Sequence, residues 1–542
     1  MNSPIFVLTM KATCIDYSET HSFSETLLKY IAGDSKLQPY ISYQPCRENF
    51  GKLISRKPPI NREALVNALK KQYADQRYAN TESALVFQNI ESLSQAETYT
   101  ITTGHQLNIF TGPLYFIFKI VTAINLASDL KATYPDKNFV PVYWMATEDH
   151  DFAEINHTKL AGQKFSWDET VSGATGRIDP KSIRATLKSY INSLGISENS
   201  QKLAAILEEA YLNSNSLAEA TRYLVHCLFA EYGLLILDAD DIELKRQFSD
   251  IVKQDLLDQK SHQAITETSK KLEEDGFQTQ VHAREINFFY LKDGLRERIV
   301  FENQRWEVLN TDIHFSREEL IAEIDNHPDR FSPNVVMRPL YQEVILPNLA
   351  YVGGGAEIVY WLQLKQNFDQ FGISFPILIP RNSALIARQS FYNKLDKLKI
   401  SVKDIFKDTE ALKKDYVIRH SEHSLNLNAE WDEFNALFEK LKKRSADIDP
   451  TLAASSDAVK TRLKTALSNL EKKFVKAEKR NHEVALRQIE TFRNTYFPGN
   501  SLQERTENFG LLYTQYGDKF IAELIHHFKP LDFKFTVLEF QS

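Results

Sequence analysis

The chain has 542 residues and a mass of 62.5 kDa, which is enough for roughly three or four structural units that each bury a hydrophobic core. Its 65 basic and 72 acidic side chains give a formal net charge of −7 and a pI of about 6.1. This balance excludes a general electrostatic attraction to nucleic acids or to anionic membranes, so we expect neither kind of partner. Hydrophobic residues make up 43% and charged residues 25% of the chain, as in ordinary folded proteins.

The cysteines and the N-terminus indicate the cellular compartment. Cys14, Cys46 and Cys227 are far apart and odd in number, which fits neither a disulfide framework nor the paired ligands of a zinc site. The short apolar stretch between Met1 and Met10 lacks the basic region and the cleavage site of a signal peptide, and either methionine can be the first residue. No apolar run approaches the ~20 residues of a membrane helix, so we expect a cytoplasmic protein.

Short apolar runs separated by helical segments predict an α/β core in the first part of the chain. Most of the runs are continuously apolar, which is typical of strands buried on both faces of a parallel sheet. The predicted strands are 99–103, 139–145, 234–238, 344–352 and 373–379. Apolar residues at helical spacing predict a helix over 113–131. We interpret residues 1–386 as a doubly wound α/β core whose ligand-binding loops follow the carboxyl ends of the strands.

Two insertions are expected to interrupt this core, at about 156–221 and 260–330. The first has a mixed and mostly helical composition. In the second, two β-rich runs flank Asp293-Gly294, a dipeptide that favours a β-hairpin. The second insertion is therefore predicted to form a small β-containing appendage.

After the core, a composition rich in Lys, Glu, Leu and Ala predicts long helices from Ser383 to Asn500. Apolar residues of one of these helices follow spacings of three and four, as in a coiled coil. They are Val459, Leu463, Ala466, Leu470, Phe474, Ala477 and Val484, with Asn481 counted in the same seam. We expect a coiled-coil domain over 387–500 with a helical hairpin turning at Asp449-Pro450, a homodimer formed through its apolar stripe, and a C-terminal segment, 501–542, that packs back on the core.

A glycine-containing loop follows the first predicted strand and leads into the first core helix. Free backbone N–H groups and the positive end of the helix dipole favour a phosphate or a carboxylate there. The candidate binding residues are Gly104, His105, Gln106, Asn108, Thr111 and Gly112 in the loop and Lys119 on the helix. The alternative is a turn that is capped by Thr111 and carries a solvated histidine.

The densest polar cluster of the chain, Glu148-Asp149-His150-Asp151, directly follows the apolar strand that contains Trp144. Four consecutive ionisable residues at the end of a buried strand are costly unless they meet a cation, an amine or one another. We therefore assign acid–base roles to the last three residues and substrate contacts to Trp144 and Glu148. A metal site that includes His157 and a salt-bridged helix N-terminus are the alternatives, and we predict no metal ligand because HExxH spacing is missing.

Two further loops complete the candidate site. One contains three consecutive glycines and leads into an apolar helix, so it suits a nucleotide or a sugar, although a simple strand cap explains the glycines equally well. The other ends the last core strand, where an arginine can bind a carboxylate or a phosphate bidentately or form a surface ion pair. The candidate binding residues of these loops are Gly353, Gly354, Glu357, Tyr360, Arg381, Asn382 and Ser383.

Four sequence motifs occur in the order TTGHQLNIFTGPLYFIFK, PVYWMATEDHDFAEINH, YVGGGAEIVYW and IPRNS. Together with LQER and VLEF near the C-terminus, they resemble the BshC family of bacillithiol biosynthesis proteins. The resemblance implies a Rossmann-type parallel-sheet core with two connecting-peptide insertions, as in class I aminoacyl-tRNA synthetases, and an α-helical coiled-coil domain through which the family dimerises. It also implies a ligase that joins the carboxyl group of L-cysteine to the amine of glucosaminyl malate, with ATP and its accompanying Mg²⁺ as the expected source of activation.

A mechanistic hypothesis follows from the resemblance. One of the three acid–base candidates takes the amine proton, and Asn108 or Thr111 stabilises the oxyanion together with loop N–H groups. Arg381 or Lys119 pairs with the malate carboxylates. The alternatives are a metal-dependent hydrolase that uses the polar cluster from Glu148 to His157 and a non-catalytic scaffold built on the coiled coil.

Overall fold

The computed structural model describes residues 10–79 and 83–540. These residues form two compact units. Among them, unit 1 comprises 10–18, 22–79, 83–386 and 503–540, and unit 2 comprises 19–21 and 387–502. The prediction that the N-terminus is no signal peptide concerns residues 1–9, which lie outside the described residues.

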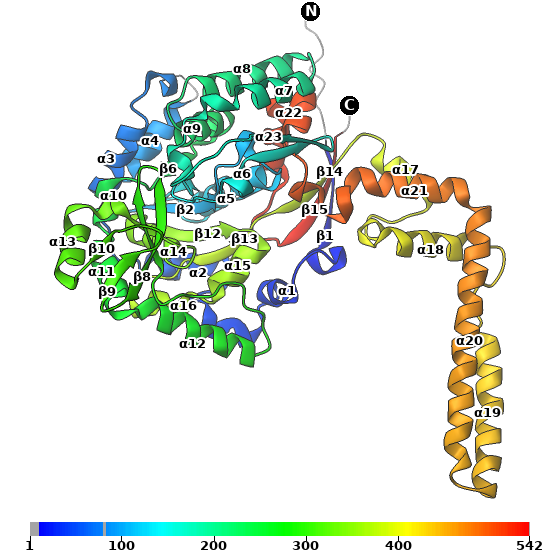
Figure 1. The fold of residues 1–542 in the computed structure, drawn as a ribbon. Helices are drawn as coiled ribbons and strands as arrows, with labels where there is room; N and C mark the ends of the chain where they lie inside the picture. The colour runs from blue at the N-terminus through cyan, green and yellow to red at the C-terminus, as the bar shows by residue number, and fades with distance from the viewer. Residues whose placement is uncertain (1–9, 80–82, 541–542) are drawn as a thin grey trace, which may run out of the picture. The chain divides into compact units, whose positions relative to one another are not determined.

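Unit 1 is built on a five-stranded parallel sheet with helices on both faces, which confirms the predicted fold class (Figure 1). Its strands are β2 (Thr98–His105), β3 (Asn138–Met145), β6 (Leu235–Asp238), β12 (Asn348–Gly353) and β13 (Ile377–Pro380). They lie in the order β13-β12-β2-β3-β6. Strand β2, the first of these five along the chain, therefore lies between β3, the second, and β12, the fourth, as in a doubly wound Rossmann-type sheet.

Alternate residues of strand β3 face two different hydrophobic cores. On β3, Val142 and Trp144 belong to one core, and Tyr143 and Met145 belong to the other. Helices α3 (Arg62–Gln72), α4 (Ala84–Ser92), α14 (Arg338–Ile345) and α15 (Gly355–Leu362) contribute to the first, and α5 (Tyr115–Thr133) and α9 (Leu217–Phe229) to the second. Both faces are covered, which explains the continuously apolar strands. Helix α5 confirms the helix predicted over 113–131.

Two predicted elements differ from the structure. The apolar run 344–352 begins inside α14, and its strand starts only at Asn348, since Pro347 has no N–H with which to extend a sheet. The prediction of helices from Ser383 onward was wrong for the first five residues, which form strand β14 (Ser383–Ala387). All five are buried and β14 lies beside β15 (Lys534–Phe540), so tertiary packing overrides local composition there.

The chain between β3 and β6 is mostly helical. It contains helix α6 (Phe152–Ile155), the hairpin of β4 (His157–Leu160) and β5 (Gln163–Ser166), and helices α7 (Arg184–Leu194), α8 (Glu198–Leu212) and α9. The chain between β6 and β12 contains α10 (Ile242–Arg246), α11 (Ser249–Asp258), α12 (Lys260–Glu274), α13 (Arg317–Asn326) and a second five-stranded sheet. This sheet is antiparallel in the order β10-β9-β8-β7-β11.

The strands of the antiparallel sheet confirm the predicted hairpin. They are β7 (Phe288–Lys292), β8 (Leu295–Glu302), β9 (Arg305–Val308), β10 (His314–Phe315) and β11 (Phe331–Pro333). Lys292 pairs with Leu295 across Asp293-Gly294. Gly294 has a φ of +71°, a conformation that this turn requires and that glycine adopts without strain.

The two ends of unit 1 meet in a third sheet. Strand β1 (Met10–Asp16) runs antiparallel to β15, from Met10 opposite Phe540 to Asp16 opposite Lys534. The remaining helices of the unit are α1 (Glu25–Ile31), α2 (Arg47–Ile54), α16 (Lys365–Gln370), α22 (Gly510–Tyr516) and α23 (Asp518–His527). No helix in the described part of the chain has the length and apolar character needed to cross a membrane.

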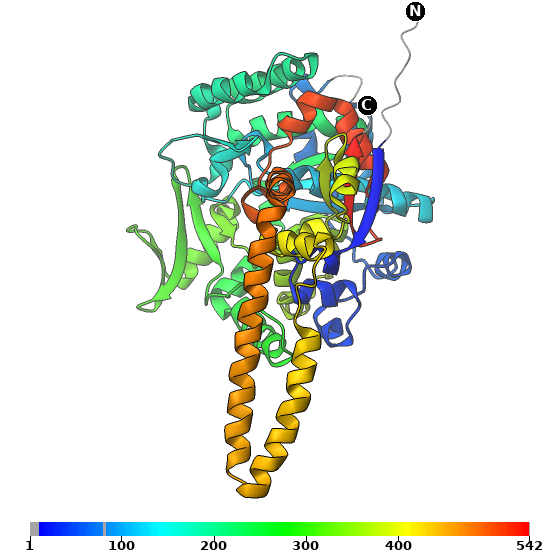
Figure 2. The same ribbon diagram turned by 90° about the vertical axis from the view of Figure 1, so that its right-hand side faces the viewer.

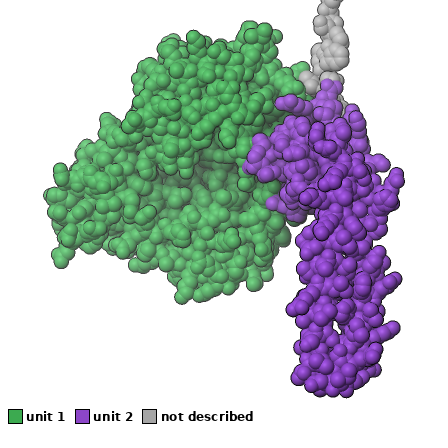
Figure 3. Space-filling model, turned by 45° about the vertical axis from the view of Figure 1, so that its right-hand side comes forward, with its two compact units in different colours: residues 1–18, 22–386, 503–541 green, residues 19–21, 387–502, 542 purple. Residues whose placement is uncertain are grey.

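Unit 2 is helical, and its long helices α19 (Asn428–Ile448) and α20 (Leu452–Asn481) form the predicted antiparallel hairpin (Figure 2; unit 2 is purple in Figure 3). Its other helices are α17 (Phe391–Leu398), α18 (Thr409–His420) and α21 (Glu483–Tyr496). The predicted seam does not lie on one helix, because α20 ends at Asn481 and Val484 belongs to α21. Its residues on α20 are covered only in part. Leu463 and Phe474 are half-buried, whereas Val459 and Leu470 are 50% and 40% exposed. A single partner helix leaves the rest of the apolar stripe uncovered.

Candidate functional site

A cavity of about 580 Å³ opens in unit 1 at the carboxyl ends of β2, β3 and β12. The strand order reverses between β2 and β12, and such switch points are where doubly wound sheets bind ligands. Residues from three of the four predicted loops meet in this cavity. Those that line it are Gly104, His105, Gln106, Lys119, Trp144, Glu148, Asp149, His150, Glu357 and Tyr360.

Lys119 and Glu357 form an ion pair inside the cavity wall. Nζ of Lys119 lies 2.5 Å from Oε1 of Glu357 and donates to the carbonyl oxygen of Gly104 at 2.9 Å. Burial lowers the pKa of Lys119, and the carboxylate opposes that change. Burial also raises the pKa of Glu357, but the Lys119 charge and a hydrogen bond from Tyr351 (2.7 Å) bring it below its usual value. Both groups are therefore charged and neutralise each other.

The glycine loop after β12 is closed by the same carboxylate. Oε1 of Glu357 accepts the backbone N–H of Gly354 at 3.0 Å and so caps the N-terminus of α15. The Gly354 N–H is therefore already bonded to a side chain of the protein itself, and a nucleotide or sugar contact at this loop stays a prediction. A Cβ on Gly353 would lie 3.1 Å from Cβ of Glu357 and 3.1 Å from the Tyr351 ring, so a larger residue would require these neighbours to shift by a few tenths of an ångström.

His105 lies at the end of β2 with its ring in the cavity wall. Its Nε2 is buried and has no hydrogen-bond partner among the described residues, and the rings of Tyr115 and Phe116 lie 5.4 Å away. Burial, followed by the nearby charge of Lys119, lowers the pKa of His105 to about 3. The imidazole is therefore neutral at physiological pH and offers a ligand one unused nitrogen.

Asp149 and His150 are the acid–base candidates that reach the cavity. Oδ2 of Asp149 accepts a hydrogen bond from Nε2 of Gln106 at 2.6 Å. Nδ1 of His150 lies 2.6 Å from Nη1 of Arg296. Because a guanidinium only donates, Nδ1 is the acceptor and the proton of the neutral imidazole resides on Nε2. His150 can thus take a proton at Nδ1 only after Arg296 has moved away.

Glu148 points into a buried charge network. Its Oε1 lies 2.5 Å from Nζ of Lys245, which also lies 3.1 Å from Asp240. Arg177 donates to Asp240 at 2.8 Å. Burial raises the pKa of Glu148 although Lys245 acts in the opposite direction. For Asp240 the same burial effect is outweighed by the two cations, so its pKa is lowered. Lys245 lies on α10, in the chain that follows β6, and no motif or spacing identifies it in advance.

The second half of the loop after β2 does not reach the cavity. Thr111 and Gly112 are buried, and Asn508 of the C-terminal segment donates to the carbonyl oxygens of Phe110 and Gly112 at 2.8 and 2.7 Å. Asn108 donates to the backbone of α6. The predicted oxyanion roles of Asn108 and Thr111 have no support in this geometry, because neither residue lines the cavity.

Asp151 and the tract from Arg381 to Ser383 also lie outside the cavity. The Asp151 side chain caps α6. Nη2 of Arg381 lies 2.7 Å from Oε1 of Glu504, and their side chains are 7% and 0% exposed. Asn382 donates to the carbonyl oxygen of Lys529 at 3.1 Å. These residues attach the C-terminal segment to the core, and the predicted carboxylate clamp at Arg381 is replaced by this internal ion pair.

Sequence reasoning missed the residues that the antiparallel sheet and its flanks add to the cavity. They include His282, Arg284, Phe289, Arg296, Asn334 and Arg338. The segment VHAREINFFYLKDGLRER does show basic residues around the predicted hairpin, but strand alternation alone cannot reveal which edge of an insertion faces the core.

The metal alternative finds no ligand set in the structure. Among residues 10–79 and 83–540, no three or more His, Cys, Asp or Glu side chains are grouped so that they could hold a metal ion. His157 lies on β4, and its Nδ1 is 3.2 Å from Oδ1 of Asn156. The three cysteines all lie within the described residues, and none of them forms a disulfide bond.

A doubly wound parallel sheet with a charged cavity at its switch point defines a Rossmann-type protein built to bind a small polar ligand. Comparison with known families narrows this class. The model for the N-terminal Rossmann-like domain of the bacillithiol biosynthesis protein BshC matches residues 10–382, and the model for its C-terminal coiled-coil domain matches residues 384–540. The chain belongs to the BshC family of bacillithiol biosynthesis proteins.

Curated relatives match over nearly their whole length, and each carries the name putative cysteine ligase BshC. The relative from Flavobacterium johnsoniae is 43% identical over 533 residues, which cover 98% of this chain and 100% of the relative. The relative from Flavobacterium psychrophilum is 41% identical, with 98% and 100% covered. The relative from Christiangramia forsetii is 38% identical, with 98% and 99% covered.

Proposed function

We propose that this protein is a cytoplasmic ligase that joins the carboxyl group of L-cysteine to the amine of glucosaminyl malate in the last step of bacillithiol biosynthesis. The observation that carries the proposal is the near full-length similarity to relatives named as cysteine ligases. The cavity supports it, because a carboxylate, an imidazole and several cations line one space at the switch point of the sheet.

Amide formation at neutral pH requires an activated carboxyl group and an uncharged amine. We propose ATP, with its Mg²⁺, as the source of activation. Activation attaches a phosphate-bearing leaving group to the cysteine carboxyl group. The amine nitrogen then attacks the cysteine carbonyl carbon, the C–N bond forms, and the C–O bond to the leaving group breaks. The amine proton passes to a base, and Asp149 suits this role because Gln106 holds its carboxylate at the cavity.

Nucleotide phosphates need donors other than those predicted from the sequence. Glu357 caps the N-terminus of α15, and the second half of the loop after β2 packs inside the unit. The groups that suit phosphate oxygens are the arginines of the cavity. Lys119 is less suited, because its charge is already neutralised by Glu357.

We also propose that the protein is a homodimer through its coiled coil. The supporting observation is the apolar surface that α19 and α20 leave exposed, which includes Leu437, Val459 and Leu470 at 50%, 50% and 40%. A twofold partner would bury it, and twofold assemblies are the commonest among soluble proteins.

The ligase proposal is tested with the purified full chain, L-cysteine, Mg-ATP and glucosaminyl malate, with mass spectrometry as the readout. The expected result is bacillithiol that appears only when all three substrates are present. In a deletion strain we expect glucosaminyl malate to accumulate and bacillithiol to be absent. An unchanged thiol content in that strain would overturn the proposal.

A further inference from the structure

The cavity contains positive charge that the protein itself does not neutralise. Lys119 is paired with Glu357. By contrast, Arg284, Arg296 and Arg338 line the cavity, and none of them has a carboxylate within 4 Å among the described residues. Arg296 and Arg338 are partly buried, and partly buried arginines are normally paired, so two of them without a carboxylate partner in one cavity are costly unless a ligand supplies the negative charge. Arg284 is exposed and adds a third positive charge at the cavity.

Arg296 is held in place by contacts with neutral groups, and no carboxylate of the described residues lies within ion-pair distance of it. Its Cζ lies 4.0 Å from the centre of the Phe289 ring, and its Nε donates to Oγ of Ser332 at 3.1 Å. Burial lowers its pKa even though the carboxylates of Glu148 and Asp149 act in the opposite direction. These contacts fix the guanidinium at the cavity, where it can bind carboxylate or phosphate oxygens.

Arg338 has a donor with no acceptor. Its Cζ lies 5.8 Å from the Trp144 ring and 5.6 Å from the Tyr351 ring, and Nη1 donates to Gln342 at 3.1 Å. Nη2 is buried and has no hydrogen-bond partner within the described residues. A buried, unsatisfied donor of a charged group is rare in folded proteins and is expected where a ligand supplies the acceptor.

We propose that Arg284, Arg296 and Arg338 form a subsite for a ligand group with at least two negative charges. The identity of the ligand rests on the proposed function, which offers two sources of this chemistry: the two carboxylates of the malyl group and the phosphates of the nucleotide. Arg296 also donates to Nδ1 of His150. An anion that takes over this guanidinium frees Nδ1, so binding at the subsite and the availability of His150 are coupled.

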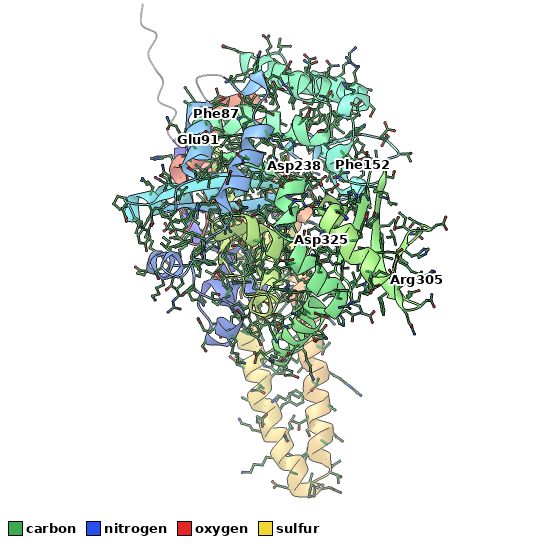
Figure 4. The ribbon with its side chains drawn as sticks, turned by 90° about the vertical axis from the view of Figure 1, so that its left-hand side faces the viewer. Phe87, Glu91, Phe152, Asp238, Arg305 and Asp325 are labelled. Carbon is green, nitrogen blue, oxygen red and sulfur yellow. The ribbon has the colours of Figure 1, made fainter. Side chains whose placement is uncertain are left out.

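The test measures binding of three probes to the full-length protein by calorimetry: L-malate, glucosaminyl malate and Mg-ATP. The variants are R284Q, R296Q and R338Q. The control is R305Q. Arg305 (labelled in Figure 4) is exposed on β9 of the same sheet and does not line the cavity, and its Nε lies 2.7 Å from Oε1 of Glu307. Loss of one charge-assisted hydrogen bond predicts affinity that is about 10- to 100-fold weaker in the cavity variants and unchanged in R305Q. Since Arg284 is exposed, R284Q keeps the test decisive if R338Q does not fold.

The three probes distinguish a subsite for the malyl carboxylates from a subsite for the nucleotide phosphates. Weaker binding of L-malate and glucosaminyl malate with unchanged Mg-ATP binding supports a dicarboxylate subsite, and weaker binding of Mg-ATP alone supports a phosphate subsite. Unchanged affinities for all three probes in folded variants overturn the subsite, as does an unmodified protein that binds none of them. If the arginine variants lose binding but the unmodified protein forms no bacillithiol, the subsite stands and the ligase proposal fails. If the variants bind and turn over normally, only the subsite fails.

Discussion

Replacing Glu504 with glutamine removes the carboxylate that neutralises the buried guanidinium of Arg381. The two groups lie 2.7 Å apart, and Oγ of Ser383 and the backbone N–H of Ala384 donate to the same carboxylate at 3.1 and 3.0 Å. Glutamine has nearly the same shape, so the substitution leaves no cavity. Removing one partner of a buried ion pair costs about 3–5 kcal/mol, because the remaining charge stays buried without compensation.

The assay is urea unfolding of the full chain, followed by intrinsic fluorescence. We expect the free energy of unfolding of unit 1 in E504Q to fall by about 3–5 kcal/mol, with a lower midpoint and an unchanged dependence on urea. The control is D369N, which breaks the exposed i,i+4 pair of Lys365 and Asp369 (2.5 Å). Pairs of this kind contribute about 0.3–0.5 kcal/mol.

The double variant R381M/E504Q tests the physical reason. It removes the buried charge together with its partner, so its loss should be smaller than the sum of the two single losses by at least ~1 kcal/mol. A loss below about 1 kcal/mol for E504Q, or full additivity in the double variant, would refute the reasoning that an uncompensated charge causes the loss.

Three further predictions concern the site, the pH dependence and the assembly. D149N and H150A should unfold at the same urea concentration as the unmodified protein but form bacillithiol at least ~100-fold more slowly. Mass spectrometry of timed reactions measures these rates, and a normal rate would contradict the acid–base role of the residue that was replaced. Burial raises the pKa of Asp255 to about 6, so its contribution to stability is greatest below the unfolded value of about 3.9 and is lost as the pH rises through 6. D255N should therefore stabilise the protein by roughly 3 kcal/mol above pH 6 and by much less at pH 4, and urea unfolding at both pH values checks this. L463D/L470D should convert a dimer into monomers in light scattering, and an unmodified protein that is already monomeric at micromolar concentration would contradict the proposed assembly.

The fold could be predicted where burial leaves a clear trace in the sequence. Strands β2 and β3 are buried almost throughout, and their bounds were predicted to within two residues at each end. The run 344–352 was ambiguous, because an apolar stretch that covers the end of a buried helix and the start of a buried strand has no periodicity that separates them. Strand β14 was not predicted, because the lysine-rich sequence that follows it favours a helix. Its pairing with β15 explains why it is extended.

The candidate site could be predicted as far as the parallel sheet determines it. Residues at the carboxyl ends of neighbouring parallel strands must meet at one edge, and Gln106 and Asp149 meet there at 2.6 Å. The same argument does not reach the residues of the antiparallel sheet. Arg296 contacts His150 only because an insertion of more than one hundred residues folds back over the switch point, and nothing in the local sequence specifies that docking.

The sequence predicted least well which cationic side chains of the site are available to a ligand, because this depends on carboxylates that are remote in the chain. Arg381 pairs with a carboxylate 123 residues away, and Lys119 pairs with the glycine-loop carboxylate of Glu357, so the two cations predicted to bind malate are already neutralised. Arg284, Arg296 and Arg338 belong to no motif of the sequence, yet none of them has a carboxylate partner among the described residues. A charged side chain that has found its counter-ion inside the protein stabilises the fold, and one that has not is available to a ligand. The ligand subsite that we propose therefore rests on the arginines that have no carboxylate partner among the described residues, and only the folded chain reveals them.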